Sequence, residues 1–222
     1  MKDTISGKDL INKAKEYIDE GFSKMNREVK DPRLLGRYVL AATYKAIRLS
    51  DAIILLCKNG KVEEAIPTLR SLMEHVINMC WITNKGSETR LQKYMSVLGN
   101  YKFGSIWTNE KLDMRMRELG FDDDYYDFCM KVTYDYSHVN ATALRWGEVF
   151  EHPQLSKKGW SPEALYMVTA QMLGHVIKTL DKTFPGYFDG YRNIWSKIRV
   201  EKKMRKKVEE LKETIEKQLH TS

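Results

Sequence analysis

The chain has 222 residues, of which 42% are hydrophobic and 30% are charged, with only 5 prolines and 13 glycines. This composition is typical of a globular protein and excludes a disordered or collagen-like chain. The three cysteines include no CxxC pair, which argues against a disulfide framework or a zinc ribbon and indicates a reducing cytoplasm. No apolar leader opens the chain, and the longest strongly apolar run, Ala52–Cys57, is too short to span a bilayer. We therefore expect a cytoplasmic protein without membrane contact.

The net charge of +7 is concentrated near the C-terminal end. Residues 191–222 hold 10 Lys or Arg against 5 Glu, and the apolar residues Met204, Val208, Leu211 and Ile215 form a short heptad seam there. Such a helix either binds nucleic acid through phosphates or presents an ordinary solvated surface. The candidate nucleic-acid contacts are Lys197, Arg199, Lys202, Lys203, Arg205, Lys206 and Lys207.

Apolar residues recur at helical spacing along most of the chain, and turn residues separate the segments. The stretch 33–58 is apolar on several sides, which predicts a core helix. Pro67 in the next segment must lie near the first turn or at a kink. Residues 140–159 fit no clear pattern. The expected segments are 6–28, 33–58, 62–83, 87–98, 109–119, 125–137, 161–184 and a helix within 191–222.

Two helix starts carry specific signals. Ser6 or Asp9 can cap the first segment, because a side-chain oxygen accepts hydrogen bonds from the free N–H groups of a helix start. The run Ser161-Pro162-Glu163 combines a capping hydroxyl, a proline at the first helical position and an acid in the first turn.

No stretch alternates polar with β-branched residues, and no internal repeat of 20 to 50 residues is present. The sequence therefore predicts an all-α protein, an irregular bundle of about seven to nine helices with a basic, partly heptad C-terminal helix. We expect residues 1–190 to form the bundle domain and residues 191–222 to pack on it or extend from it. The GxGxxG, GxxxxGK[ST], HExxH, GxSxG and ExxH motifs are missing, so we expect no cofactor and no metal site.

One face of the segment 62–83 gathers polar side chains opposite an apolar side. At 100° per residue, six of these residues fall within an arc of about 140°. Arg70 and Glu74 are one turn apart and can form an ion pair. The face is either an ordinary solvent face or a buried, electrostatically perturbed site. The arc consists of Pro67, Arg70, Ser71, Glu74, His75 and Asn78.

A second polar group, Tyr136, Ser137 and His138, ends the segment 125–137. Such residues serve in binding or proton transfer, although they can also cap the last carbonyl groups of a helix. We interpret them as functional, because few caps need so many polar groups. His175, beside apolar residues in the segment 161–184, is instead expected to be a core or edge histidine.

The runs LRSLMEH at 69–75 and YSHVN at 136–140 resemble a family of uncharacterised bacterial helical proteins. Members of that family share an LRS-x-x-E helix and a later S-x-x-H or S-H element. The resemblance covers roughly residues 35–185. It implies a helical fold but no activity, because the family carries no established activity.

Arg70 and His75 also fit the R-x4-H pattern of HEPN domains, helical bundles of bacterial toxins and phage defence that cut RNA across a dimer. Ser71 departs from the Asn, Asp or His that usually follows the arginine, and the motif lies early in its helix rather than late. The resemblance implies a metal-independent ribonuclease. In it Arg70 would stabilise the charge of the phosphorane and His75 would act as acid or base on the 2′-hydroxyl.

The sequence supports two functional hypotheses. In the first, a dimeric bacterial or phage protein of toxin or defence type acts on RNA through a polar pocket. In the second, a non-catalytic module binds nucleic acid or a partner helix through its C-terminal helix, which would also contribute to a homodimer. The pocket of the first hypothesis consists of Arg70, Glu74, His75, Tyr136, Ser137 and His138.

Overall fold

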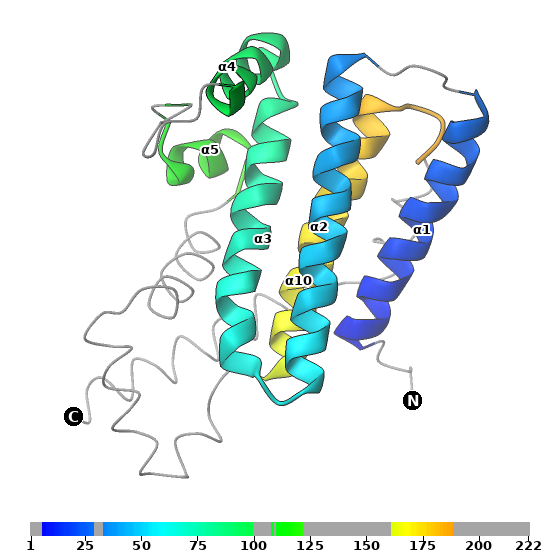
Figure 1. The fold of residues 1–222 in the computed structure, drawn as a ribbon, viewed down its shortest axis with the longest axis vertical. Coiled ribbons are helices and arrows are strands. Elements are labelled where there is room, and N and C mark those ends of the chain that lie inside the picture. The colour runs from blue at the N-terminus through cyan, green and yellow to red at the C-terminus, as the bar shows by residue number, and fades with distance from the viewer. Residues whose placement is uncertain (1–5, 29–32, 100–107, 109, 122–160, 189–222) are drawn as a thin grey trace.

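The computed structural model describes residues 6–28, 33–99, 108, 110–121 and 161–188. Every regular element within these ranges is a helix, which confirms the all-α prediction for this part of the chain. The total of seven to nine helices and the division at residue 190 extend beyond it and stay predictions. The six described helices are α1 (Gly7–Glu28), α2 (Leu34–Lys58), α3 (Val62–Ile82), α4 (Ser87–Gly99), α5 (Leu112–Glu118) and α10 (Pro162–Thr183) (Figure 1).

Helix α10 contacts α1, α2 and α3, and the four form a bundle (Figure 1). It runs parallel to α1, since the N–H of Gly7 donates to Glu163 at 2.8 Å at one end and the Tyr187 hydroxyl donates to Glu28 at 2.8 Å at the other. Figure 1 shows α3 running in the same direction. Helix α3 therefore ends, and α10 begins, at opposite ends of the bundle, so the two are not related as an up-down hairpin pair.

The core is richest along α10, in which 12 of 22 residues are buried. Its apolar residues recur on more than one side, which suits a helix with three neighbours. Fully burying one Val, Leu or Ile side chain stabilises a fold by about 1.5–3 kcal/mol. The predicted start is confirmed, because Ser161 Oγ accepts the N–H of Ala164 at 3.2 Å and Pro162 is the first helical residue.

Within the described residues, the other predicted boundaries also lie close to the observed ones. Ser6 Oγ accepts the N–H of Asp9 at 3.1 Å and so caps α1. Gly60 has a φ of 73°, in the left-handed region that favours glycine, and it follows the end of α2. Pro67 lies inside α3. Helix α5 begins at Leu112, so it is shorter than the predicted segment 109–119.

Helix α2 departs from the prediction of a core helix. Leu34, Tyr44 and Leu55 are 53%, 55% and 61% exposed, although the sequence around them is apolar. The reason is that α3 and α10 cover two sides of α2, while α1, among the described helices, reaches only the edge of its outward side, through Phe22 and Lys15. Apolar content alone therefore did not show which side of this helix is buried.

A close approach at Gly21 lets the segment after α10 close the core beside α1. The ring of Phe188 lies against the Gly21 backbone, where a Cβ atom would overlap it. Phe188 is fully buried and meets Phe22 edge to face, with ring centroids 5.9 Å apart. Only glycine leaves room for this ring.

We predict that Gly21→Ala lowers the free energy of unfolding by about 1–3 kcal/mol, because overpacking at Phe188 outweighs the gain of up to about 1 kcal/mol from better helix propensity. Urea denaturation of the variant and of wild type measures the change. Ser23→Ala, at an exposed position of the same helix, is the control and should be nearly neutral. A stabilised Gly21→Ala variant would show that the ring does not depend on this space.

Candidate functional site

Helix α3 carries the polar face that its sequence predicts. Arg70, Glu74, His75 and Asn78 are half-buried and Ser71 is exposed, while the apolar residues of the opposite side are buried. The same helix thus supplies one side to the core and another to the boundary between core and solvent.

Arg70 and Glu74 form the predicted ion pair. Arg70 Nε donates to Glu74 Oε1 at 2.9 Å, and an Nη nitrogen of Arg70 lies 2.9 Å from the same oxygen. The Arg70 side chain is 17% exposed and the Glu74 side chain 40%. The pair is therefore charge-assisted and partly shielded, yet solvent still reaches its carboxylate.

A second guanidinium group reaches this face from α5. Arg115 Nη1 donates to Oδ1 of Asn78. Burial lowers the pKa of Arg115, and the negative charges of Glu74 and Glu110 oppose that shift. The Glu74 carboxylate thus interacts with Arg70 directly and with Arg115 through its field. We call Arg70, Glu74, Asn78 and Arg115 the α3–α5 polar face.

A stacked cluster holds α5 in place. Trp81 Nε1 donates to Glu118 at 2.6 Å, and the Arg90 guanidinium lies 3.7 Å from the centroid of the Trp81 ring. Arg90 also donates to Glu118 at 2.7 and 3.0 Å and to the Trp81 carbonyl at 2.8 Å. Burial raises the pKa of Glu118, but the hydrogen bonds from Arg90 and Trp81 outweigh it and leave the pKa lowered. This cluster joins α3, α4 and α5 and thereby places Arg115 beside Asn78.

His75 points to α2 instead of to Arg70. Its Nε2 lies 2.8 Å from the carbonyl oxygen of Ala42, and because a carbonyl only accepts, Nε2 carries the proton. Burial lowers the pKa of His75, the hydrogen bond to Ala42 opposes the shift, and the charge of Lys45 lowers the pKa further. The ring is therefore neutral at pH 7, with Nδ1 as its acceptor. Arg70 and His75 hold different partners, so the structure does not join them in one pair.

His175 fits the expectation of a core or edge histidine. Its ring packs against that of Phe121, with centroids 4.8 Å apart. Burial lowers the pKa of His175 to about 4, and the nearby charge of Lys178 acts in the same direction. Its carbonyl accepts the Thr179 hydroxyl at 2.9 Å, and the Cys80 thiol lies 3.4 Å from that hydroxyl. Burial raises the pKa of Cys80, so this thiol stays protonated at neutral pH.

The other predicted site residues, Tyr136, Ser137 and His138, lie outside the described residues, as does the basic segment 191–222. Their approach to Arg70 and their contact with nucleic acid stay predictions.

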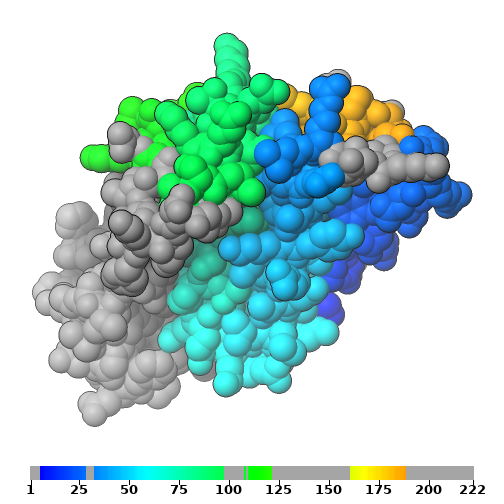
Figure 2. Space-filling model, turned by 45° about the horizontal axis from the view of Figure 1, so that its top comes forward, coloured from blue at the N-terminus to red at the C-terminus, as the bar shows by residue number. Residues whose placement is uncertain are grey.

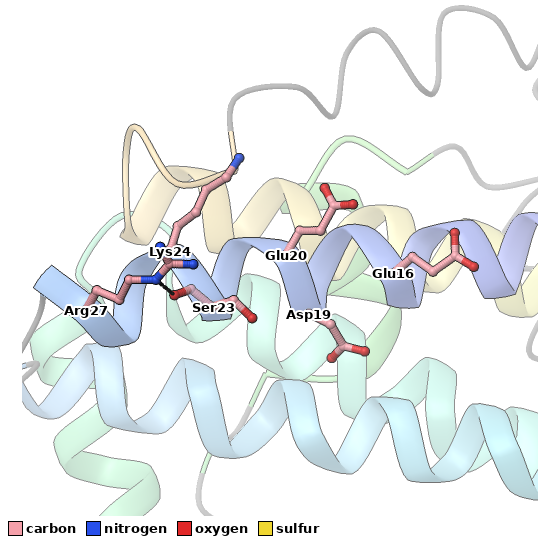
Figure 3. Close-up of a pocket in the computed structure, with 6 residues that line it drawn as sticks. All are labelled: Glu16, Asp19, Glu20, Ser23, Lys24 and Arg27. Atoms are coloured by element: carbon pink, nitrogen blue, oxygen red, sulfur yellow. Dashed lines mark hydrogen bonds between the residues drawn. The ribbon is translucent and has the colours of Figure 1, made fainter.

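A shallow hollow of about 450 Å³ runs along the outer face of α1 (Figure 3). One helix alone lines it, and Figure 3 shows Asp19 pointing away from Glu16 and Glu20. Arg27 Nε donates to the Ser23 carbonyl at 3.2 Å, within the same helix. Mixed charges that do not converge make a solvated surface rather than a binding site.

Two further findings concern the described residues only. No three of their His, Cys, Asp and Glu side chains are grouped so that they could hold a metal ion. None of their helices combines the length and the apolar character that crossing a bilayer requires.

Sequence reasoning missed Arg115 and the cluster of Trp81, Arg90 and Glu118. Asn78 and Arg115 are 37 positions apart, and no motif relates them. The only signal was the crowding of charged residues between 109 and 119, which is equally typical of a solvated helix.

We predict that His175 makes stability depend on pH in a specific window. Its pKa is about 4 when folded and about 6.5 when unfolded, so the stability from burying the neutral ring is complete above pH 6.5 and is lost as the pH falls to 4. Between pH 6.5 and pH 4, the free energy of unfolding of wild type should fall by about 3 kcal/mol more than that of the His175→Gln variant. Urea denaturation at both pH values measures the difference. Equal losses in the free energy of unfolding of the two proteins would show that His175 is not buried as a neutral ring.

Residues 36–103, less than a third of the chain, match DUF5677, a family of unknown function. The matched segment contains most of α2, all of α3 and α4, and hence Arg70, Glu74 and His75. It supports the resemblance to an uncharacterised family, whereas the likeness to HEPN domains stays a prediction. No match was found among curated proteins or among solved structures. The chain is thus similar over this segment to a family that carries no assigned activity.

Proposed function

We propose that this chain binds RNA through phosphate contacts at the α3–α5 polar face. The observation that carries the proposal is that two guanidinium groups meet on one face of α3: Arg70 pairs with the partly exposed carboxylate of Glu74, and Arg115 donates to Asn78 one turn further along. Guanidinium groups donate paired hydrogen bonds that match phosphate oxygens as well as carboxylate oxygens. A phosphate that reaches this face would replace Glu74 as the acceptor of Arg70.

Two features favour a binding role over a purely structural ion pair. The Glu74 side chain is 40% exposed, so a ligand can reach it. Arg115 is brought to the same face although burial lowers its pKa, which means that its charge is held there at a cost. A partly exposed ion pair stabilises a fold by about 1 kcal/mol or less, which is too little to explain why the Arg115 charge is partly buried at this face.

A metal-independent ribonuclease of toxin or defence type is the second candidate, and the state of His75 favours it. The neutral ring, held at Nε2 by Ala42, offers Nδ1 as the acceptor for the proton of a 2′-hydroxyl. The freed 2′-oxygen would attack the phosphorus, and Arg70 would stabilise the charge on the phosphorane. In this proposal the run Tyr136–His138 supplies the proton for the leaving 5′-oxygen.

The non-catalytic hypothesis remains a third proposal, supported by the charge of residues 191–222. There the basic helix contacts nucleic acid or a partner helix and contributes to a homodimer, while the ion pair on α3 serves only the fold. Replacing Lys202, Lys203 and Arg205 with Gln would then weaken RNA binding more than any substitution on α3.

We predict that Arg70→Ala combined with Arg115→Ala weakens binding of a short fluorescein-labelled RNA by about tenfold or more, as fluorescence anisotropy would measure. Between about 50 and 200 mM salt, the negative slope of log K against log salt should become less steep by about 1.4, since two phosphate contacts are lost. The control, Lys24→Ala with Arg27→Ala on α1, removes the same charge elsewhere. If both double variants bind alike and melt like wild type, the polar face is not the binding site.

Cleavage is tested separately, with EDTA present. His75→Gln keeps an N–H donor for the Ala42 carbonyl but removes the proton acceptor, so the fold should persist. We expect RNA cleavage by wild type and a loss of at least about a hundredfold in this variant, the usual size of a general-base contribution. Equal cleavage by both proteins would remove His75 from the mechanism, and binding without cleavage would leave the first proposal alone.

A further inference from the structure

The outward face of α2, beside the site, is a surface with several exposed side chains that no described helix covers. Figure 2 shows α2, in light blue to cyan, open to solvent between α1 and α3. The exposed residues Arg37, Ala41, Tyr44, Lys45 and Arg48 recur at the three- and four-residue spacing of one helix face. We call these five residues the α2 outer face.

The α2 outer face is basic. The single acidic residue of α2 is Asp51, and it forms an ion pair with Lys15 of α1. Among the described residues, no carboxylate forms an ion pair with Lys45 or Arg48. Two positive charges one turn apart therefore face solvent without a counterion from the described helices, which suits a ligand that carries repeated negative charges.

Tyr44 adds an aromatic platform to this surface. Its ring lies 5.4 Å from that of Phe22 on α1, with 37° between the ring planes, and the residue is still 55% exposed. One side of the ring is thus supported by the core while much of it remains accessible. A supported aromatic ring beside two cations is the arrangement on which proteins stack unpaired bases.

The α2 outer face adjoins the α3–α5 polar face through His75. The His75 ring donates to Ala42 on α2, and the charge of Lys45 acts on it. Going round α3, the half-buried Asn78 and the exposed Ser71 separate Glu74 from His75 on the same helix. The two surfaces therefore form one path from Arg70, past His75, to Lys45 and Arg48.

We infer that the ligand is single-stranded RNA and that it follows this path. Its phosphates contact Arg70 and Arg115 at one end and Lys45 and Arg48 at the other, with a base stacked on Tyr44. This inference rests on the proposed function and assigns its substrate class. A duplex hides its base faces, so Tyr44 could not stack on one, and the single strand should be preferred.

The charge contacts are tested with Lys45→Gln combined with Arg48→Gln in the full chain. The matched control is Lys13→Gln with Lys24→Gln, two exposed lysines of α1. With a short fluorescein-labelled single-stranded RNA, we expect the α2 variant to bind about tenfold more weakly than the control. Its slope of log K against log salt should be less steep by about 1.4. Thermal melting shows whether both variants fold.

The aromatic contact is tested with Tyr44→Ala against Tyr44→Phe, which keeps the ring. We expect Tyr44→Phe to bind like wild type and Tyr44→Ala to bind the single strand about fivefold or more weakly, since it loses the ring on which a base stacks. The same RNA annealed to its complement should bind more weakly than the single strand and show no difference between the two variants.

The outcomes separate this inference from the proposed function. If the α2 variant binds like its control while Arg70→Ala with Arg115→Ala loses binding, the path across α2 is wrong and phosphate binding on α3 and α5 stands. If the duplex binds as tightly as the single strand, the substrate class is wrong. If wild type binds neither RNA, both the inference and the proposed function are overturned.

Discussion

The parallel packing of α10 against α1 and α3 is the constraint on which the rest of the structure depends. Helix α10 is the last described element of the chain, yet its buried side chains pack against all three other helices of the bundle. It is tied to α1 at both ends, through Gly7 with Glu163 and through Glu28 with Tyr187. Because its inner sides are filled by apolar contacts, α2 and α3 are fixed as a pair on one side of it, and their polar residues must face outward.

This constraint accounts for the position of the candidate site. The apolar side of α3 packs into the bundle, which leaves Arg70, Glu74 and Asn78 at its edge. The stack of Trp81, Arg90 and Glu118 then fixes α5 so that Arg115 reaches the same edge. His75 lies at the seam with α2, where a main-chain carbonyl sets its tautomer. The site thus combines residues positioned by the core with one delivered by a short helix.

Local signals predicted the helices well, because caps and helical spacing are properties of adjacent residues. Ser161 caps α10, and Arg70 pairs with Glu74 one turn later. The exposure of Leu55 and the arrival of Arg115 were not predictable, since they depend on which helices become neighbours in space. The exposure of Lys45 and Arg48 has the same origin: their spacing defines a face, but only the fold leaves these two side chains exposed.

If RNA phosphates bind Arg70 and Arg115 as proposed, both guanidinium groups must respond to the same ligand. The most direct measurement is an NMR titration of the ¹⁵N-labelled full chain with short single-stranded RNA, following the side-chain Nε–H signals of both arginines. The two signals should shift together with one shared Kd, because phosphates of the same RNA replace Glu74 as the acceptor of Arg70 and pair with Arg115. Signals that stay in place while RNA binds elsewhere would contradict it.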